Sequence, residues 1–217
     1  LDEVQQAALR TAHMNYYMQL VYDQGQQFYS ASNQQVMRTL EDELDNIRAA
    51  RRWAIQTRDH DALDKAAEMM PVYDCRGMWH EALDVFTQAL DIVGRDARTI
   101  TAARIRQLIV LCAYRLRRQN YEAFTEETVR IFDELHEYRQ SFVARDMLAS
   151  YAIDRGDFAT ARTITEQRLA VARQQDHHLG VYHALQTMGI ISISEGDPAR
   201  GERELLESTR IAHLRGD

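Results

Sequence analysis

The chain has 217 residues, of which 45% are hydrophobic and 27% charged, a composition typical of a folded globular protein. It contains only two prolines and nine glycines, which favours an all-α fold because strands joined by tight turns use more of both. The formal net charge is -7 and the arginines are dispersed among carboxylates, so direct binding to nucleic acid is not expected.

The first predicted helices cover residues 3–29 and 33–57. Within the second, the segment EDELDNIRAARRWAIQT (41–57) has its acids at the start and its arginines later, which is the order that the helix dipole favours. Apolar residues recur there at steps of three and four and form one stripe, which consists of Leu40, Leu44, Ile47, Ala50 and Ala54. The segment is therefore predicted to pack against other helices and to carry no reactive site.

Eight further helices are predicted from the same periodicity and from capping residues. They cover residues 61–75, 78–93, 97–118, 120–136, 138–155, 158–174, 178–195 and 198–214. No low-complexity linker separates them. The chain is therefore expected to form one continuous array of about ten helices.

A short frame recurs along these helices with a period of about forty residues. The first position of this repeated pattern is occupied by glycine at Gly77, Gly156 and Gly196. In the unit between the first two of these glycines, the same position is occupied by Gln119. Glycine supplies the left-handed conformation that ends a helix, and a small residue five positions later lets two helices approach closely. Such a period predicts an α-solenoid of antiparallel helix pairs.

This frame resembles the tetratricopeptide repeat. The landmarks that match are Gly77, Trp79, Ala82 and Ala89, then Gly156, Phe158 and Ala161, and finally Gly189 with Gly196. Arg168 and Ser208 depart from the pattern, since the repeat has alanine at their places, and the period exceeds the usual one of about 34 residues. The resemblance implies a right-handed superhelix whose concave groove is lined by the first helix of each pair.

The N-terminal part of the chain carries a second resemblance. The segment YYMQL (16–20) precedes ELDNIRAARRWA (43–54) and then the repeats, which is similar to the region that follows the nucleotide-binding and winged-helix domains in bacterial signal-transduction ATPases with numerous domains. These include LuxR-like and antibiotic-regulatory-type transcriptional regulators. The resemblance implies bridging helices in residues 1–60, sensor repeats in residues 61–217, and an upstream nucleotide-binding domain in a longer parent chain.

The sequence shows no pattern that indicates catalysis. A Gly-Lys-Ser/Thr phosphate loop and a GxGxxG turn are both missing, and Lys65, the only lysine, is expected to be solvated. His177, His178 and His183 form the most metal-like cluster, but no pair among them has the i, i+4 spacing of helical zinc ligands. We expect no enzyme activity, no cofactor and no metal.

Cys75 and Cys112 are too few and too isolated for a disulfide framework, and both are expected to be small core residues in a reducing cytosol. Trp53 and Trp79 have helical core spacing and are expected to be packing residues. No apolar run is long enough to span a bilayer, and the first residues lack the apolar core of a signal peptide. A cytoplasmic location without membrane contact is therefore expected.

A protein or peptide partner, or a small inducer, is expected in the groove. Mapping the groove positions of the tetratricopeptide repeat onto this chain gives six candidates, which are Arg106, Ile109, Asp146, Ser150, His183 and Gln186. The alternative is that these are merely exposed helix residues, because solenoid faces are mostly solvated. The Lys and Asn set that clamps a carboxy-terminal carboxylate is missing, so a chaperone-tail receptor is not expected.

Two other classes of function compete with a partner-binding sensor. One is structural self-association, in which exposed terminal helices stack between copies of the chain. The other is a hydrolase that uses the histidine cluster, which has little support from the spacing of its residues.

Overall fold

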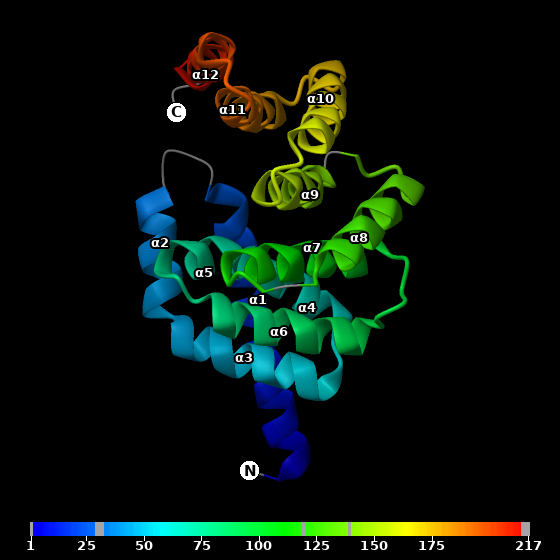
Figure 1. Cartoon of the computed structure of the whole chain (residues 1–217). Helices are drawn as coiled ribbons and strands as arrows, with labels where there is room; N and C mark the ends of the chain where they lie inside the picture. The colour runs from blue at the N-terminus through cyan, green and yellow to red at the C-terminus, as the bar shows by residue number, and fades with distance from the viewer. Residues whose placement is uncertain (1, 29–32, 119, 139, 214–217) are drawn as a thin grey trace. The chain divides into compact units, whose positions relative to one another are not determined.

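The computed structural model describes residues 2–28, 33–118, 120–138 and 140–213, and the regular elements in these ranges are all helices (Figure 1). They are α1 (Glu3–Gln27), α2 (Asn33–Asp42), α3 (Leu44–Thr57), α4 (His60–Ala66), the 3₁₀ turn η1 (Ala67–Met69), α5 (Met70–Arg76), α6 (Trp79–Val93), α7 (Ile100–Arg115), α8 (Glu122–Glu134), α9 (Phe142–Asp154), α10 (Phe158–Gln174), α11 (His178–Ser194) and α12 (Pro198–His213). Sequential helices pack as antiparallel pairs. The predicted all-α fold of helix pairs is confirmed.

Two compact units account for the contacts between these helices. Unit 1 is Leu1–Arg117 and contains α1 to α7, and unit 2 is Arg118–Asp217 and contains α8 to α12. The assignment of residues 1–60 to a bridge and of 61–217 to a continuous sensor array concerns function and stays a prediction.

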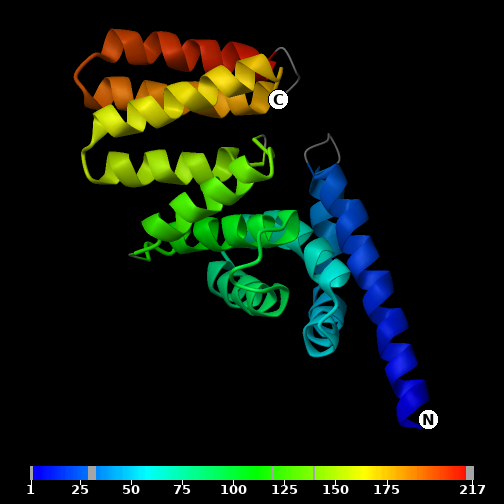
Figure 2. The same cartoon turned by 90° about the vertical axis from the view of Figure 1, so that its right-hand side faces the viewer.

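In unit 1 the long helix α1 packs against α3 and α4. It begins with a capping box, in which the Asp2 carboxylate accepts from the Gln5 amide and the Gln5 side chain accepts from the Asp2 amide. Met14, Met18 and Val21 are buried against the rest of the unit. The N-terminal end of α1 extends past the helices that it contacts, so its first turns are largely solvent-exposed (Figure 2).

Of the predicted apolar stripe, Leu40, Ile47, Ala50 and Ala54 are at most 1% exposed, whereas Leu44 is only partly buried. The single helix predicted over residues 33–57 is instead two helices, because the backbone breaks at Glu43 with φ -100° and ψ 8°. Glu43 is the N-cap residue of α3, and its non-helical backbone lets the axes of α2 and α3 point in different directions.

The helix predicted over residues 61–75 is also interrupted. Pro71 near the start of α5 has no amide proton, and its ring would clash with the carbonyl of Ala67 in a continuous helix. The chain therefore tightens into η1 over Ala67–Met69 before α5 begins. The apolar pattern of the sequence did not reveal this interruption, because Met69 and Met70 on either side of it are both buried.

In both units the second helix of a pair begins two residues after a left-handed residue. Gly77, Gly156 and Gly196 have φ of 65°, 75° and 86°, as the frame predicted. Before α8 the left-handed residue is Asn120 with φ 68°, one position later than the Gln119 that the sequence frame assigned. Asparagine tolerates this conformation better than most residues, which explains the corrected register. Gln119 itself lies outside the described residues.

The small residues of the frame lie where helices meet. Ala82 in α6 and Ala161 in α10 are each 0% exposed. At the crossing of α11 and α12, a Cβ atom added to Gly201 would stand 2.9 Å from the carbonyl oxygen of Gly189, so glycine is required there. The corrected frame also places Thr125 of α8, which is 0% exposed, in the small-residue position.

Candidate partner-binding surfaces

The six predicted groove residues fall into two groups. Arg106 and Ile109 lie on α7 in unit 1 and are only 6% and 3% exposed. Arg106 donates from Nη1 to the backbone carbonyl of Arg95 at 3.0 Å, so its guanidinium is engaged inside the unit. Helix α7 is covered on several sides, and these two side chains therefore offer little surface to a partner.

The other four candidates lie on neighbouring helices of unit 2, Asp146 and Ser150 on α9 and His183 and Gln186 on α11. The two helices are in contact. Thr187 of α11 donates from Oγ1 to the Asp146 carboxylate at 3.2 Å. These four positions therefore lie on one surface of unit 2.

A buried arginine from α10 completes the centre of this surface. Arg168 is 2% exposed and donates from Nη1 to the Asp146 carboxylate, and its buried Nε has no hydrogen-bond partner among the described residues. Sequence reasoning noted Arg168 only as a departure from alanine. That departure was the available signal, because an arginine in a helix-crossing position needs a counter-ion.

His183 stands beside this ion pair. Partial desolvation lowers the pKa of its imidazole, with Arg168 acting in the same direction and Asp146 opposing. The neutral ring is therefore favoured at neutral pH, where it can both donate and accept a hydrogen bond. Gln186 is oriented by donation from Nε2 to the Tyr182 hydroxyl at 2.8 Å.

Exposed apolar side chains border the polar centre. Helical spacing places Leu179, Ile190 and Ile193 on the same face of α11 as His183 and Gln186. These three are 45%, 51% and 49% exposed, and Val143 of α9 is 39% exposed. We call this region the α9–α11 surface, which consists of Val143, Asp146, Ser150, Leu179, His183, Gln186, Ile190 and Ile193.

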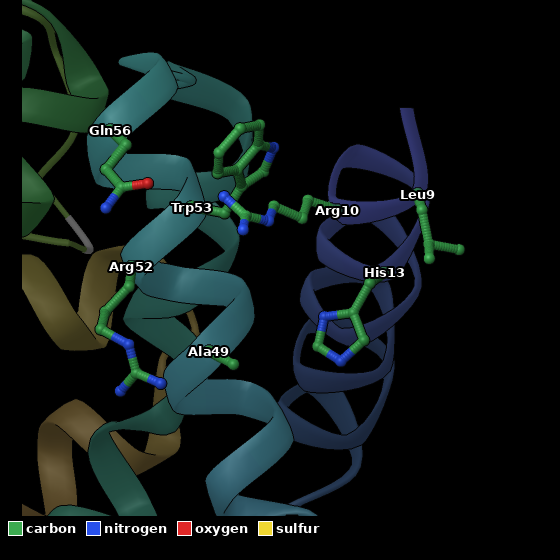
Figure 3. A pocket seen from close by; sticks show the side chains of 7 residues that line it. All are labelled: Leu9, Arg10, His13, Ala49, Arg52, Trp53 and Gln56. Atoms are coloured by element: carbon green, nitrogen blue, oxygen red, sulfur yellow. The ribbon is translucent and has the colours of Figure 1, made fainter. Parts of the chain in front are cut away.

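A second hollow lies in unit 1 between α1 and α3 (Figure 3). It has a volume of about 480 Å³ and is lined by Leu9, Arg10, His13, Ala49, Arg52, Trp53 and Gln56. Trp53, expected to be a packing residue, is only half-buried and forms part of the wall. Sequence reasoning missed this pocket because its residues come from two helices whose pairing was not predicted.

The other histidine side chains of the sequence cluster and the buried cysteine make packing or pairing contacts within the chain. The His177 ring stacks on Phe142 with centroids 4.9 Å apart, and His178 pairs with Asp176 at 2.9 Å. In the described part of the chain, no three His, Cys, Asp or Glu side chains are grouped so that they could hold a metal ion. Burial raises the pKa of the Cys112 thiol to about 12.

Cys75 was expected in the core but is exposed, because it lies in the last turn of α5 on the side away from the core. Within the described ranges, no helix is both long enough and apolar enough to cross a membrane.

The sequential antiparallel helix pairs define an all-α helical-repeat fold. The chain is similar to BtubC (BKLC) from P. vanneervenii, whose crystal structure aligns with a TM-score of 0.68 over 98% of this chain and 92% of that one. Sequence identity is 18%, so the likeness shows the fold alone. The sequence matches no known family profile and no curated protein.

Proposed function

We propose that this chain is a non-catalytic scaffold that binds a protein or peptide segment on the α9–α11 surface. The observation that carries this proposal is the combination of exposed apolar side chains with a fixed polar centre on adjacent helices. Exposed apolar groups next to oriented polar groups are typical of interaction surfaces, where the apolar groups supply affinity and the polar groups supply orientation.

The chemistry of the surface indicates what kind of segment fits. Leu179 near one end of α11 and Ile190 with Ile193 near the other would contact two separate apolar side chains of the partner. Between them, His183 and Gln186 can exchange hydrogen bonds with a peptide backbone. Because Arg168 already neutralises Asp146, the surface centre selects a polar but uncharged group.

A photo-crosslinking amino acid at Ile190 tests the proposal in cells that contain the chain. We expect it to capture a partner other than a second copy, at contacts that mass spectrometry maps to α11. Capture should be lost when Leu179→Glu or Ile193→Glu is added, and retained with Arg38→Gln on α2 as control. If the charged substitutions leave the crosslink unchanged, the α9–α11 surface is not the binding site.

We further propose that the scaffold is the sensor of a bacterial signal-transduction ATPase that controls transcription, with residues 1–60 as the bridge to an upstream nucleotide-binding domain. The support is the resemblance of segments 16–20 and 43–54 to that region of such regulators. A bound partner would act there by preferring one state of the switch, since only differential affinity shifts an equilibrium.

The reading frame that encodes the residues before Leu1 tests this context. It should encode a phosphate-binding loop of the form GxxxxGK[S/T]. If the upstream reading frame encodes no such loop, the proposed role in a signal-transduction ATPase is wrong, while the proposed partner-binding scaffold is unaffected.

Self-association is the second candidate, and the surface of α12 favours it. The fully buried residues of this helix are Gly201 and Ser208, while Leu206 is 50% exposed. A second copy could cover this face. Sedimentation over a wide range of protein concentration should then show a dimer that Leu206→Glu abolishes, whereas a constant monomer mass would exclude this reading.

A further inference from the structure

We propose that the pocket between α1 and α3 is a second binding site, which takes a small organic anion with a carboxylate or phosphate group on an apolar or aromatic body. Its volume of about 480 Å³ lies within the usual range of small-molecule sites. The site lies entirely in unit 1 and shares no residue with the α9–α11 surface, so this inference is independent of the proposed function.

The charge of the pocket walls is the first argument. Arg10 and Arg52 form no ion pair with any described residue, and neither has an acid three or four positions away on its helix. By contrast, Arg48 and Arg51 on the same helix α3 both pair with the Glu81 carboxylate. In a chain of net charge -7, two such unpaired guanidinium groups around one hollow create a local positive potential that attracts an anion.

The second argument is that the aromatic wall is held in place. Trp53 donates from Nε1 to Thr11 Oγ1 at 3.1 Å, which links α3 to α1 and fixes the indole ring. Arg10 reaches from α1 over the Trp53 ring, with its guanidinium carbon 5.2 Å from the ring centroid (Figure 3). This stacking orients the guanidinium and leaves its N–H edge available for the oxygens of a carboxylate or phosphate.

The remaining lining residues indicate which ligand body would fit. Ala49 supplies apolar contact on α3, His13 projects from α1 toward α3 as Arg10 does, and Gln56 offers an amide on the α3 rim, while Leu9 lies at the outer edge with its side chain directed away from α3 (Figure 3). An inorganic anion would use only the guanidinium groups. A ring attached to the anionic group would in addition cover Ala49 and the exposed part of Trp53, and would bind more tightly.

Trp53 provides an optical test, because Trp79 is the only other tryptophan. In the full chain carrying Trp79→Phe, fluorescence reports on the pocket alone. We expect saturable changes with phenyl phosphate or phenylacetate, and binding at least about tenfold weaker with neutral 2-phenylacetamide or with inorganic phosphate. The tighter of the two anionic probes identifies the preferred head group.

Substitutions of the two arginines complete the test. Arg10→Gln and Arg52→Gln should each weaken binding about tenfold, while Arg38→Gln on α2 should leave it unchanged. Calorimetric titration of the unsubstituted chain repeats the measurement in case Trp79→Phe disturbs folding. Equal binding of the neutral amide, unchanged affinity in both arginine variants, or the lack of any saturable signal with either anionic probe would overturn the proposal.

Discussion

Arg168 occupies a helix-crossing position in which the repeat frame has a small residue. Its aliphatic part fills the space between helices, and its guanidinium reaches the Asp146 carboxylate on α9. The Arg168 side chain is 1% exposed, whereas the Asp146 side chain is 31% exposed. The arginine therefore depends on this partner far more than the aspartate does, because water can still solvate the carboxylate.

This asymmetry predicts unequal effects of removing either charge. Asp146→Asn leaves a buried guanidinium without a counter-ion and should cost about 3 kcal/mol of unfolding free energy. Arg168→Met keeps most of the packing volume, leaves a carboxylate that water can reach, and should cost clearly less. Urea unfolding followed by circular dichroism measures both. Equal losses, or a double variant less stable than Asp146→Asn alone, would contradict the assigned dependence.

Helices α3 and α6 are joined by a compact ion-pair cluster in unit 1. Arg48 donates from Nη2 and Nε to the two oxygens of the Glu81 carboxylate at 2.6 and 2.9 Å. Arg51 donates to the same carboxylate at 3.3 Å and to the Tyr73 hydroxyl at 2.5 Å. Two basic residues of segment 41–57 thus hold α3 against α6.

The cluster predicts a pH dependence of stability. Hydrogen bonding to Arg48 lowers the pKa of Glu81 below its usual 4.5, so its contribution is fully present above that pH and is lost as the pH falls further. Glu81→Gln should therefore cost about 1–2 kcal/mol at neutral pH, and its difference from the unsubstituted chain should shrink in acid. Denaturant titrations at both pH values measure this, with exposed Asp84→Asn as control. A difference that does not change with pH would count against the pairing.

The close packing of helix α6 leads to a prediction about the stability of variants at Ala82. Ala82 is 0% exposed, so Ala82→Leu should overpack the crossing and cost about 1–3 kcal/mol. Gln88→Leu adds the same side chain to the exposed side of α6 and should change stability by no more than about 0.5 kcal/mol. Thermal unfolding of the pair separates them, and equal melting temperatures would show that Ala82 is not at a tight contact.

The whole molecule consists of two compact units, and its spectroscopic probes are unevenly distributed between them. Trp53 and Trp79 both belong to unit 1. Tryptophan fluorescence therefore reports on unit 1, whereas the far-ultraviolet circular dichroism of the helices reports on both units. Repeat proteins need not unfold in one step when the stability of their parts differs.

We expect Asp146→Asn to separate the two signals. The substitution weakens unit 2, so the circular dichroism transition should move to lower denaturant while the fluorescence midpoint stays in place. Glu81→Gln in unit 1 is the matched control and should lower the fluorescence midpoint. Coincident midpoints in the Asp146→Asn chain would show that the units unfold together.

Much of the helical fold could be predicted because its signals are local. Apolar spacing marked most helices, and the glycines at positions 77, 156 and 196 marked their ends. The errors occurred where one residue changed the backbone without changing the apolar pattern, namely at Glu43, at Pro71 and at the Asn120 turn. Periodicity reports which residues share a face, and it continues across a break that leaves that face buried.

By itself the sequence determined the class of fold, the buried stripe of segment 41–57 and the small residues at the helix crossings, because each depends on neighbours within a few turns. Only the tertiary structure decided which candidate surfaces are open. Arg106 and Ile109 are buried while His183 is exposed, although all three were predicted to line the same groove. The Arg168 pair with Asp146 and the pocket at Trp53 likewise require knowing which helix covers which, since they join residues distant in the chain.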